Sequence, residues 1–471
     1  MDVNINDLNP YLHGPYAPVE NEIVADDLVV EGEIPRDLYG GYYRNGPNPV
    51  SPPSGMHHWF DGDAMLHAVW FEDGKVTYRN RYVGTKDHMA EVAGNCNAAG
   101  ILQPANRDRT GPEYKDTAST DVVIHNGELM ALWYISGTPV RLDPLTLDTI
   151  GDETFGGKLP RRVSAHSKTD NRTGEFLFFD YALYEPWLSF GIVGADNALK
   201  HFTQIELPSP RLPHDMGMTE NYVIMHDLPV VFTEQGMKQG LWTIHQPKDL
   251  PTRFGVLPRT GRGDEIKWFE TDPCYIYHVI NCWEDGDEVV MHACKMIPNN
   301  LMPDAKYGPY APMVAVLALH AVPVEWRMNM TTGEMRERQL DDRLSEFPVV
   351  NQDWVGKKGR HSYHVSLENT DKLLFDGLMK YDLETGDCVE HKFEPGVYGS
   401  EPAFAPRVGA TDEDDGYVIT FTADQADGSS EAQIFDARGL DGGPIARVKI
   451  PQRVPLGFHA TWARGDQVKT A

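Results

Sequence analysis

Short β-rich segments that face one another across glycine-containing turns recur along the chain, and they constrain its fold more than any other feature. In residues 275–294 the side chains alternate with a period of two, pass the Asp285-Gly286 turn and return along Glu288–Met291. This pattern is typical of a β-hairpin, because short turns containing glycine suit the twist of antiparallel strands. The same pattern predicts hairpins at Val69–Val83, Val122–Trp133, His166–Asp180, Tyr277–Ala293, Trp326–Arg338, Lys380–Phe393 and Gly416–Phe435.

The spacing of these hairpins predicts how they assemble. They recur about every 50 to 65 residues, and no linker-like segment interrupts the 471 residues. Many antiparallel strands at this spacing favour a radial architecture over a sandwich. We therefore expect an all-β fold: a seven-bladed β-propeller forming one domain over residues 1–471, with residues 1–30 as an N-terminal arm packed on it and loops forming a cap. Helical periodicity is weak, and Asp341–Phe347 is expected to form at most one helical turn.

Charge and cysteine content narrow the classes of partner and compartment. The chain has 42 Lys and Arg against 70 Asp and Glu, a formal net charge of −28. Such an excess of acids argues against nucleic-acid partners and against electrostatic docking on anionic lipid, since both need clustered basic residues. The five cysteines are widely spaced, which favours reduced thiols. No apolar run approaches a membrane span and no signal peptide is visible, so we expect a cytoplasmic protein.

Four histidines in or beside predicted strands are the strongest candidates for chemistry. His166, His214, His278 and His459 follow one another at intervals of roughly one, one and three propeller repeats. An isolated histidine in such a place is usually a core residue that bonds to the backbone. The chain also has 18 histidines, which offer many accidental quartets. Both interpretations stay open on spacing alone.

The geometry of a propeller gives these intervals a functional interpretation. The innermost strand of every blade runs along the central axis, so one residue from each blade can point at a common centre. Four imidazoles meeting there suit Fe, Zn, Cu or Ni and do not suit Ca or Mg. Structural zinc usually recruits cysteine, and catalytic zinc usually has three protein ligands. Four nitrogens that leave two octahedral positions open suit an Fe(II) that binds O₂ beside a substrate.

Local motifs carry a resemblance that extends along nearly the whole chain. It resembles the carotenoid cleavage oxygenase family, which implies a seven-bladed propeller with a non-haem iron held on the axis by four histidines. The motifs that carry the resemblance are GEIPRDLYGGYYRNGPNP (32–49), HHWFDGDAMLHAVWF (57–71), SAHSKTD (164–170), PHDMGMTENYVIMHDLP (213–229), GVLPR (255–259), YIYHVINCWEDGD (275–287), EFP (346–348), EPAFAPR (401–407) and GFHATW (457–462).

The resemblance assigns roles to individual residues. It makes His166, His214, His278 and His459 the ligands of one Fe(II) per chain. It makes Glu346 and Glu401 the carboxylates that accept the outer N–H of ligating histidines, which fixes the ring and its tautomer. Thr120 matches a small residue that screens one open iron position.

One position departs from the family pattern. Where the family commonly places a third glutamate, the stretch ALWYISGTP (131–139) is one residue longer and has Tyr134. A phenol oxygen can accept a hydrogen bond from an imidazole N–H, so we expect Tyr134 to replace the glutamate as a weaker, neutral acceptor.

The resemblance also implies a reaction and two classes of substrate. With O₂ as co-substrate, such enzymes split a carbon–carbon double bond of an alkene and release two carbonyl products. Phenolic-branch enzymes place a lysine directly before the glutamate that Tyr134 replaces here, and a tyrosine in an upstream loop. Here Trp133 takes the lysine position and GILQPANRD (100–108) has no tyrosine. A carotenoid or apocarotenoid is therefore favoured, with a stilbene or phenylpropenoid (lignostilbene, isoeugenol or vinylguaiacol type) as the alternative.

Three further expectations concern membrane contact, the oligomeric state and a competing class of protein. A polyene user would make weak peripheral contact with the inner face of the membrane through an apolar rim, and Trp187–Val193, Ile101-Leu102 and Ala311–Leu319 are candidates. We expect a monomer or a weak oligomer. The competing class is a catalytically silent propeller that serves as a binding module, in which case the protein would hold no stoichiometric metal.

Overall fold

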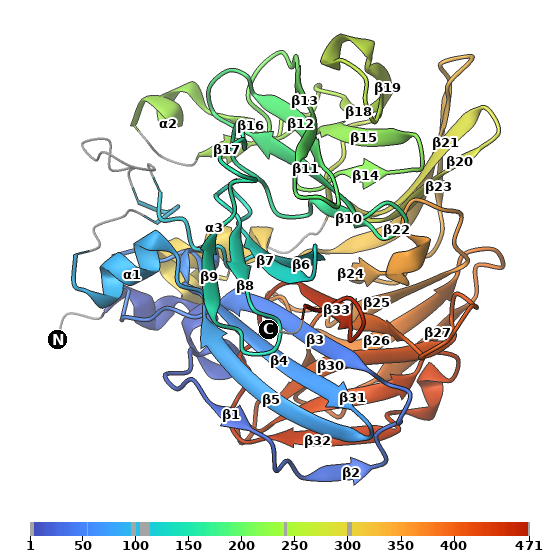
Figure 1. The fold of residues 1–471 in the computed structure, drawn as a ribbon. Coiled ribbons are helices and arrows are strands. Elements are labelled where there is room, and N and C mark those ends of the chain that lie inside the picture. Colours follow the sequence, from blue (N-terminus) through green and yellow to red (C-terminus); the bar gives the residue numbers. More distant parts are fainter. Residues whose placement is uncertain are drawn as a thin grey trace.

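Seven sheets surround a common axis in the computed structural model, which describes residues 4–53, 55–95, 100–103, 114–239, 243–298 and 304–469 (Figure 1). Each of these sheets has four or more strands, and a separate two-stranded sheet lies outside the ring. The fold is the expected all-β, seven-bladed propeller. No helix in the described part of the chain is long and apolar enough to cross a bilayer.

Blades 1, 2, 4 and 5 each consist of four consecutive strands in antiparallel order, starting with the innermost strand. Blade 1 contains β6 (Asp121–His125), β7 (Glu128–Leu132), β8 (Val140–Leu142) and β9 (Thr149–Asp152). Blade 2 contains β10 (Lys168–Asp170), β11 (Glu175–Tyr181), β12 (Leu188–Val193) and β13 (Leu199–Ile205). Blade 4 contains β20 (Ile276–Asp285), β21 (Glu288–Met296), β22 (Ala321–Asn329) and β23 (Met335–Gln339). Blade 5 contains β24 (Ser345–Val349), β25 (His361–Leu367), β26 (Phe375–Asp382) and β27 (Cys388–Lys392).

Blade 3 has the same four-stranded order but is interrupted. It contains β14 (Gly217–Met218), β15 (Tyr222–Asp227), β18 (Thr252–Pro258) and β19 (Lys267–Thr271). Between its second and third strands the chain makes an excursion that contains β16 (Val231–Phe232), α2 (Glu234–Gln239) and β17 (Ile244–His245).

Blades 6 and 7 combine strands from both ends of the chain, and this closes the ring. In blade 7 the innermost β33 comes from near the C-terminus and pairs with β3, so that Gly41 lies opposite Ala463. Blade 6 contains β28 (Val397–Gly399), β29 (Ala403–Pro406), β30 (Gly416–Asp424), β31 (Ser430–Asp436), β32 (Ala446–Ile450) and β2 (Val30–Gly32). Blade 7 contains β33 (Ala460–Arg464), β3 (Gly40–Pro47), β4 (Ala64–Glu72), β5 (Lys75–Tyr82) and β1 (Val24–Ala25).

All seven predicted hairpins are antiparallel strand pairs, but they are not distributed one to each blade. Two of them, around β20–β21 and β22–β23, share blade 4. Blade 3 has no such hairpin in the prediction, because its excursion separates β15 from β18. The helical turn expected at Asp341–Phe347 was wrong, because these residues lead directly into strand β24, whose side chains reach the axis.

The apolar core lies between neighbouring blades, whose strands are buried on both faces. β30 is buried along almost its whole length, which explains why its sequence is nearly continuously apolar. One cluster joins blades 6 and 7 through residues such as Tyr42 and Ile419. Another joins blades 1 and 2 through Leu132 and Phe178. Packing between blades therefore holds the ring together and fixes where each inner strand stands.

Helices and 3₁₀ turns occur mainly in the segments that connect the strands. The α-helices outside blade 3 are α1 (Lys86–Val92) and α3 (Ala311–Val316). The N-terminal segment is anchored on the connections by Asn9, which donates a hydrogen bond to the His57 carbonyl, and by Tyr16, which donates to the Leu373 carbonyl. The 3₁₀ turns are η1 (Ile5–Leu8), η2 (Pro10–Leu12), η3 (Gly14–Tyr16), η4 (Trp59–Asp61), η5 (Gly263–Glu265), η6 (Ala305–Tyr310), η7 (Gln352–Trp354) and η8 (Leu440–Gly442).

Candidate metal centre

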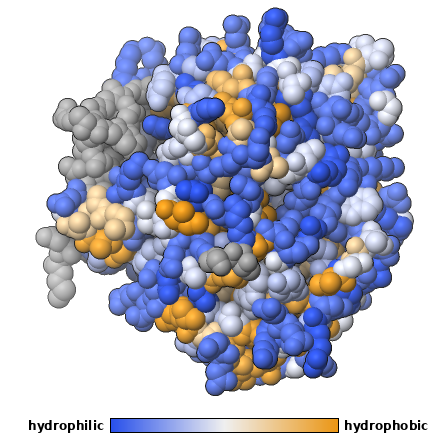
Figure 2. Space-filling view, viewed as in Figure 1, coloured by the Kyte–Doolittle hydropathy of each residue, from blue (hydrophilic) through white to orange (hydrophobic). Residues whose placement is uncertain are grey.

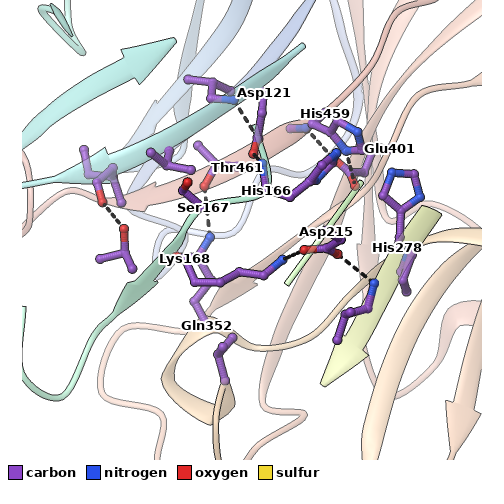
Figure 3. Close-up of a pocket in the computed structure, with 18 residues that line it drawn as sticks. Asp121, His166, Ser167, Lys168, Asp215, His278, Gln352, Glu401, His459 and Thr461 are labelled. Atoms are coloured by element: carbon purple, nitrogen blue, oxygen red, sulfur yellow. Dashed lines mark hydrogen bonds and ion pairs between the residues drawn. The ribbon is translucent and has the colours of Figure 1, made fainter. Parts of the chain in front are cut away.

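The inner strands bring the four predicted histidines together, and three of them, His166, His278 and His459, line a cavity between the blades (Figure 3). His166, His214 and His459 come just before β10, β14 and β33, and His278 is the third residue of β20. They come from blades 2, 3, 4 and 7, as the repeat spacing predicted. All four side chains are buried, with 4 to 6% of each residue exposed.

His166, His214 and His278 each have one ring nitrogen within 4.8 Å of the other two, which suits a single ion, and the ring of His459 lies beside them. Ring centroids lie 4.4 Å apart for His166 and His459, 4.6 Å for His166 and His214, and 4.8 Å for His278 and His459. The Nε2 atoms of His166 and His214 are 3.1 Å apart. Two nitrogens that each lie about 2.1 Å from one ion at a right angle are separated by about 3.0 Å. The buried Nε2 of His278 has no hydrogen-bond partner among the described residues, so it is free to act as a ligand.

The protonation of these rings also suits metal binding. Burial, reinforced by the neighbouring imidazoles, holds the pKa values of His166, His214 and His278 well below the ordinary imidazole value. These three rings are therefore neutral at pH 7, as a metal ligand must be.

Two carboxylates fix the outer nitrogens of two of the rings. Glu346, in β24, is 2.5 Å from Nδ1 of His278 through Oε2. Glu401, between β28 and β29, is 3.1 Å from Nδ1 of His459, and it also accepts the Ala460 N–H. Burial raises the pKa of Glu346 to about 8. Burial alone would lower the pKa of His459, but the charge and hydrogen bond of Glu401 outweigh it and raise that pKa.

Two aspartates that sequence reasoning missed tie neighbouring inner strands together. Asp121, at the start of β6, accepts the backbone N–H of His166 at 2.9 Å. Asp215, next to His214, accepts the backbone N–H of Val279 at 2.7 Å, beside His278. Each aspartate therefore links a strand that borders the site to the next strand around the ring. The available signal was their position directly after Thr120 and His214 in the sequence.

The backbone of His166 is strained, which makes its anchoring important. His166 has a φ of 63°, in the left-handed region that non-glycine residues seldom adopt. The hydrogen bond from its N–H to Asp121 helps to hold this conformation.

Thr120 and Tyr134 lie beside the histidines on connected segments. The Tyr134 N–H donates to Thr120 Oγ1 at 3.0 Å, and the His459 N–H donates to the Thr120 carbonyl at 3.2 Å. The ring of Tyr134 packs beside that of His214, with centroids 5.2 Å apart.

Tyr134 was expected to accept a hydrogen bond from an imidazole N–H, and it accepts none from His214, the histidine beside it. Nδ1 of His214 is buried and has no partner among the described residues. The longer stretch around Tyr134 turns sharply, with Ser136 at a φ of 65°, so the phenol ring lies alongside the imidazole and offers it no acceptor. A buried N–H without an acceptor costs about 1–3 kcal/mol.

Aromatic side chains surround the histidines where the chain leads into the inner strands. Tyr277 is 4.8 Å from His214, and Phe60 is 5.0 Å from Tyr134, measured between ring centroids. Phe347 stacks on His459 at 4.7 Å. These residues form an apolar wall that suits an apolar substrate and excludes water. In the upstream loop 100–108, residues 104–108 lie outside the described part of the chain.

Comparison with known proteins agrees with this architecture. The retinal pigment epithelial membrane protein family matches residues 16–464. The chain is 33% identical to carotenoid 9,10(9',10')-cleavage dioxygenase 1 of Pisum sativum, over 98% of this chain and 91% of that protein. It is 29% identical to isoeugenol monooxygenase of Pseudomonas nitroreducens, over 97% of this chain and 98% of that one. The crystal structure of Pseudomonas brassicacearum lignostilbene dioxygenase superposes with a TM-score of 0.88 at 29% identity, covering 97% and 99% of the two chains.

A propeller with buried imidazoles gathered at the end of its axial channel is the architecture of an oxygenase. The chain belongs to the retinal pigment epithelial membrane protein family, that of the carotenoid cleavage oxygenases, and it is an enzyme of this type.

Proposed function

We propose that the protein holds one Fe(II) on His166, His214, His278 and His459 and uses O₂ to cleave a carbon–carbon double bond of an apolar conjugated alkene into two carbonyl products. The observation that carries this proposal is the convergence of four buried imidazoles from four blades, two of them oriented by carboxylates. Four nitrogen donors without a thiolate suit iron better than structural zinc.

The protein's own contribution is positioning and the exclusion of water. When bound, the iron would supply the redox chemistry with O₂. Glu346 and Glu401 hold Nδ1 of His278 and His459, which leaves Nε2 of each ring as the nitrogen that would bind the ion. Thr120 borders the site through its contacts with Tyr134 and His459. The aromatic wall holds the alkene beside the ion, and the reaction requires no general base.

We favour a carotenoid or apocarotenoid as the substrate. Trp133 stands at the position where a phenol-binding lysine is expected, and it is almost completely buried. The similar Pisum sativum dioxygenase is named for carotenoid cleavage. The second candidate is a stilbene or phenylpropenoid, which the high structural similarity to a lignostilbene dioxygenase supports.

Anaerobically purified, Fe(II)-loaded protein incubated in parallel with an apocarotenal, resveratrol and isoeugenol tests both the reaction and the substrate. We expect two carbonyl fragments from the apocarotenal by mass spectrometry, with O₂ consumed. Products from resveratrol or isoeugenol alone would replace the polyene by a phenolic substrate. The His278→Ala variant is the control and should bind no stoichiometric iron. Full iron content and turnover in that variant would overturn the assignment of the site.

We also propose weak peripheral contact with a membrane by a protein that is a monomer or a weak oligomer. Met89 and Val92 on α1 are 58% and 61% exposed, and Figure 2 shows an apolar patch over this helix. The three rims expected from sequence contribute less, because Ile101 and the whole of β12 are buried. In Ala311–Leu319 the strongly exposed large apolar residue is Val316.

We expect this contact to be apolar and not electrostatic, because the acidic Asp87 and Glu91 on α1 would be repelled by anionic lipid. Flotation with neutral phosphatidylcholine vesicles should therefore show weak binding that high salt does not release, and Met89→Ser should reduce it. Binding that requires anionic lipid would contradict an apolar contact.

A further inference from the structure

A channel with polar and charged groups in its wall lies beside the histidines (Figure 3). Residues of the inner strands β6, β10, β20, β24 and β33 line it, so it follows the propeller axis. His166, His278, His459 and Glu401 form its inner end. Further along, its wall contains Asp121, Ser167, Lys168, Asp215, Gln352 and Thr461. A second cavity shares Lys168, Val279 and Gln352 with this channel and continues along β14, β20 and β24.

The direction of the inner strands explains why the residues on the two sides of the histidines differ in polarity. The histidines lie at or just before the start of their strands, so the residues that follow them line the channel. These following residues include Lys168, Asp215 and Thr461, which are polar or charged. The residues that precede the histidines include Tyr277 and Phe458, which belong to the large aromatic and apolar cluster. Val279 and Ala460 also line the channel directly after histidines, but the charged side chains lie on this side of the centre and the aromatic rings on the other.

Two side-chain links lie in the wall of the channel. Lys168 Nζ, from blade 2, is 2.7 Å from Asp215 Oδ1, next to blade 3. Gln352, on η7 of blade 5, donates a hydrogen bond of 2.9 Å to Thr461 Oγ1 in blade 7. The Lys168 side chain is 23% exposed, whereas that of Asp215 is 2% exposed. Lys168 thus places a positive charge between solvent and the carboxylates of the channel.

A hydrated divalent cation is compatible with only one of these two approaches. Moving an ion out of water into apolar surroundings is very costly unless polar groups replace its hydration shell. The carboxylates of Asp121, Asp215 and Glu401 can do this along the channel, whereas the aromatic wall offers mainly ring faces. The carboxylates would attract a cation, and Lys168 would repel it.

We infer that divalent metal ions reach the histidines through this axial channel, with Lys168 as the residue that controls their passage. This inference rests on the proposed metal centre, but it concerns the rate of loading and makes no use of turnover. A barrier along a path slows association and dissociation alike. Changes at the mouth of the channel should therefore move both rates in the same direction.

Stopped-flow absorbance of Co²⁺ binding to the metal-free protein gives the association rate, and displacement by a chelator gives the dissociation rate. Lys168→Met should raise both rates about threefold or more at low salt, because it removes a like charge from the path. The effect should shrink as salt is raised. Gln352→Trp should lower both rates, because it narrows the mouth.

A matched control separates a channel effect from a change in net charge. Lys295 also has a side chain that is 23% exposed and paired with an acid, but it lies on β21 and lines neither cavity of the channel. Lys295→Met should leave both rates unchanged. Circular dichroism and thermal unfolding confirm that each variant is folded.

The outcomes distinguish this inference from the function on which it rests. Wild-type rates in both Lys168→Met and Gln352→Trp would overturn the channel while leaving the metal centre intact. Opposite changes in the two rates would also overturn it, since they would mean that Lys168 acts on affinity alone. Failure of the wild-type protein to bind Co²⁺ would instead remove the metal centre, and the channel with it.

Discussion

At the scale of single residues, the histidines of the centre differ in whether a carboxylate holds the outer ring nitrogen, Nδ1. His278 and His459 each have a carboxylate on Nδ1, whereas Nδ1 of His214 has no partner among the described residues. Tyr134 fills the space beside His214 with its ring and supplies no acceptor. Tyr134 is therefore a neutral aromatic residue where the resemblance predicts a third glutamate, and it leaves His214 without an orienting acceptor.

This difference predicts unequal effects of two substitutions on metal affinity. Glu346→Gln should weaken Co²⁺ binding about 10- to 100-fold, because a bound cation favours the ionised carboxylate beside Nδ1 of His278, and glutamine cannot supply that charge. Tyr134→Phe should change the Kd less than about twofold, because no hydrogen bond to a ligand is lost. Competition with a chelator of known affinity measures both values. Equal weakening in the two variants would show that the phenol oxygen supports the metal after all.

At the scale of elements, hydrogen bonds from aspartates to backbone amides fix the inner strands relative to one another. Asp121 accepts N–H groups from Val122 and His166, and Asp215 accepts those of Met216 and Val279. The histidines are thereby positioned through their backbones as well as through their rings. This matters most at His166, whose positive φ would otherwise relax.

Asp121→Asn tests this role. An asparagine has one acceptor oxygen, so one of the two N–H groups loses its partner, at a cost of about 1–3 kcal/mol in the free energy of unfolding. Urea denaturation measures the change, and Co²⁺ affinity should fall with it. Asp196→Asn is the control, because Asp196 is exposed, accepts the Ala198 N–H and pairs with Lys200 at the surface; its effect should stay below about 0.5 kcal/mol. Equal losses of unfolding free energy in the two variants would contradict the role of Asp121 in fixing the inner strands.

At the scale of the whole molecule, ion pairs between blades supplement the apolar packing between them. Asp170 in blade 2 pairs with Arg259, which follows the last residue of β18 in blade 3, at 2.7 Å. Arg172 reaches the same carboxylate at 2.9 Å. Burial alone would raise the pKa of Asp170, but the hydrogen bonds from the two arginines outweigh it and lower that pKa to about 2.

Asp170→Asn should therefore destabilise the ring in a pH-dependent manner. At pH 7 the variant removes the carboxylate that Arg172 and Arg259 share, while Arg259 keeps Glu175 at 2.6 Å. We expect a loss of about 2 kcal/mol in the free energy of unfolding. A depressed pKa stabilises the folded state above the ordinary carboxyl value near 4, and this stabilisation is lost as pH falls towards 2. Urea denaturation should show a constant gap between wild type and variant from pH 7 to 5 and a narrower gap at pH 3. A gap that stays the same at pH 3 would contradict this assignment.

The hairpins show which part of the fold could be predicted from sequence. Side-chain alternation and turns such as Asn126-Gly127 are local, so the paired strands follow from the residues themselves. Blade 3 escaped prediction because its second and third strands are joined through a long excursion and not through a turn. The way in which β3 and β33 close blade 7 is likewise invisible locally, because the partners lie at opposite ends of the chain.

By itself, the sequence determined most of the strand pairs, and its motifs, through their resemblance to a known family, indicated the propeller and the four histidines, because alternation and motifs are properties of neighbouring residues. Only the tertiary structure decided that Asp121 and Asp215 anchor ligand-bearing strands, that Nδ1 of His214 is left without an acceptor, and that a polar channel runs along the axis. Those features arise between blades, where residues far apart in the chain meet only after the ring has closed.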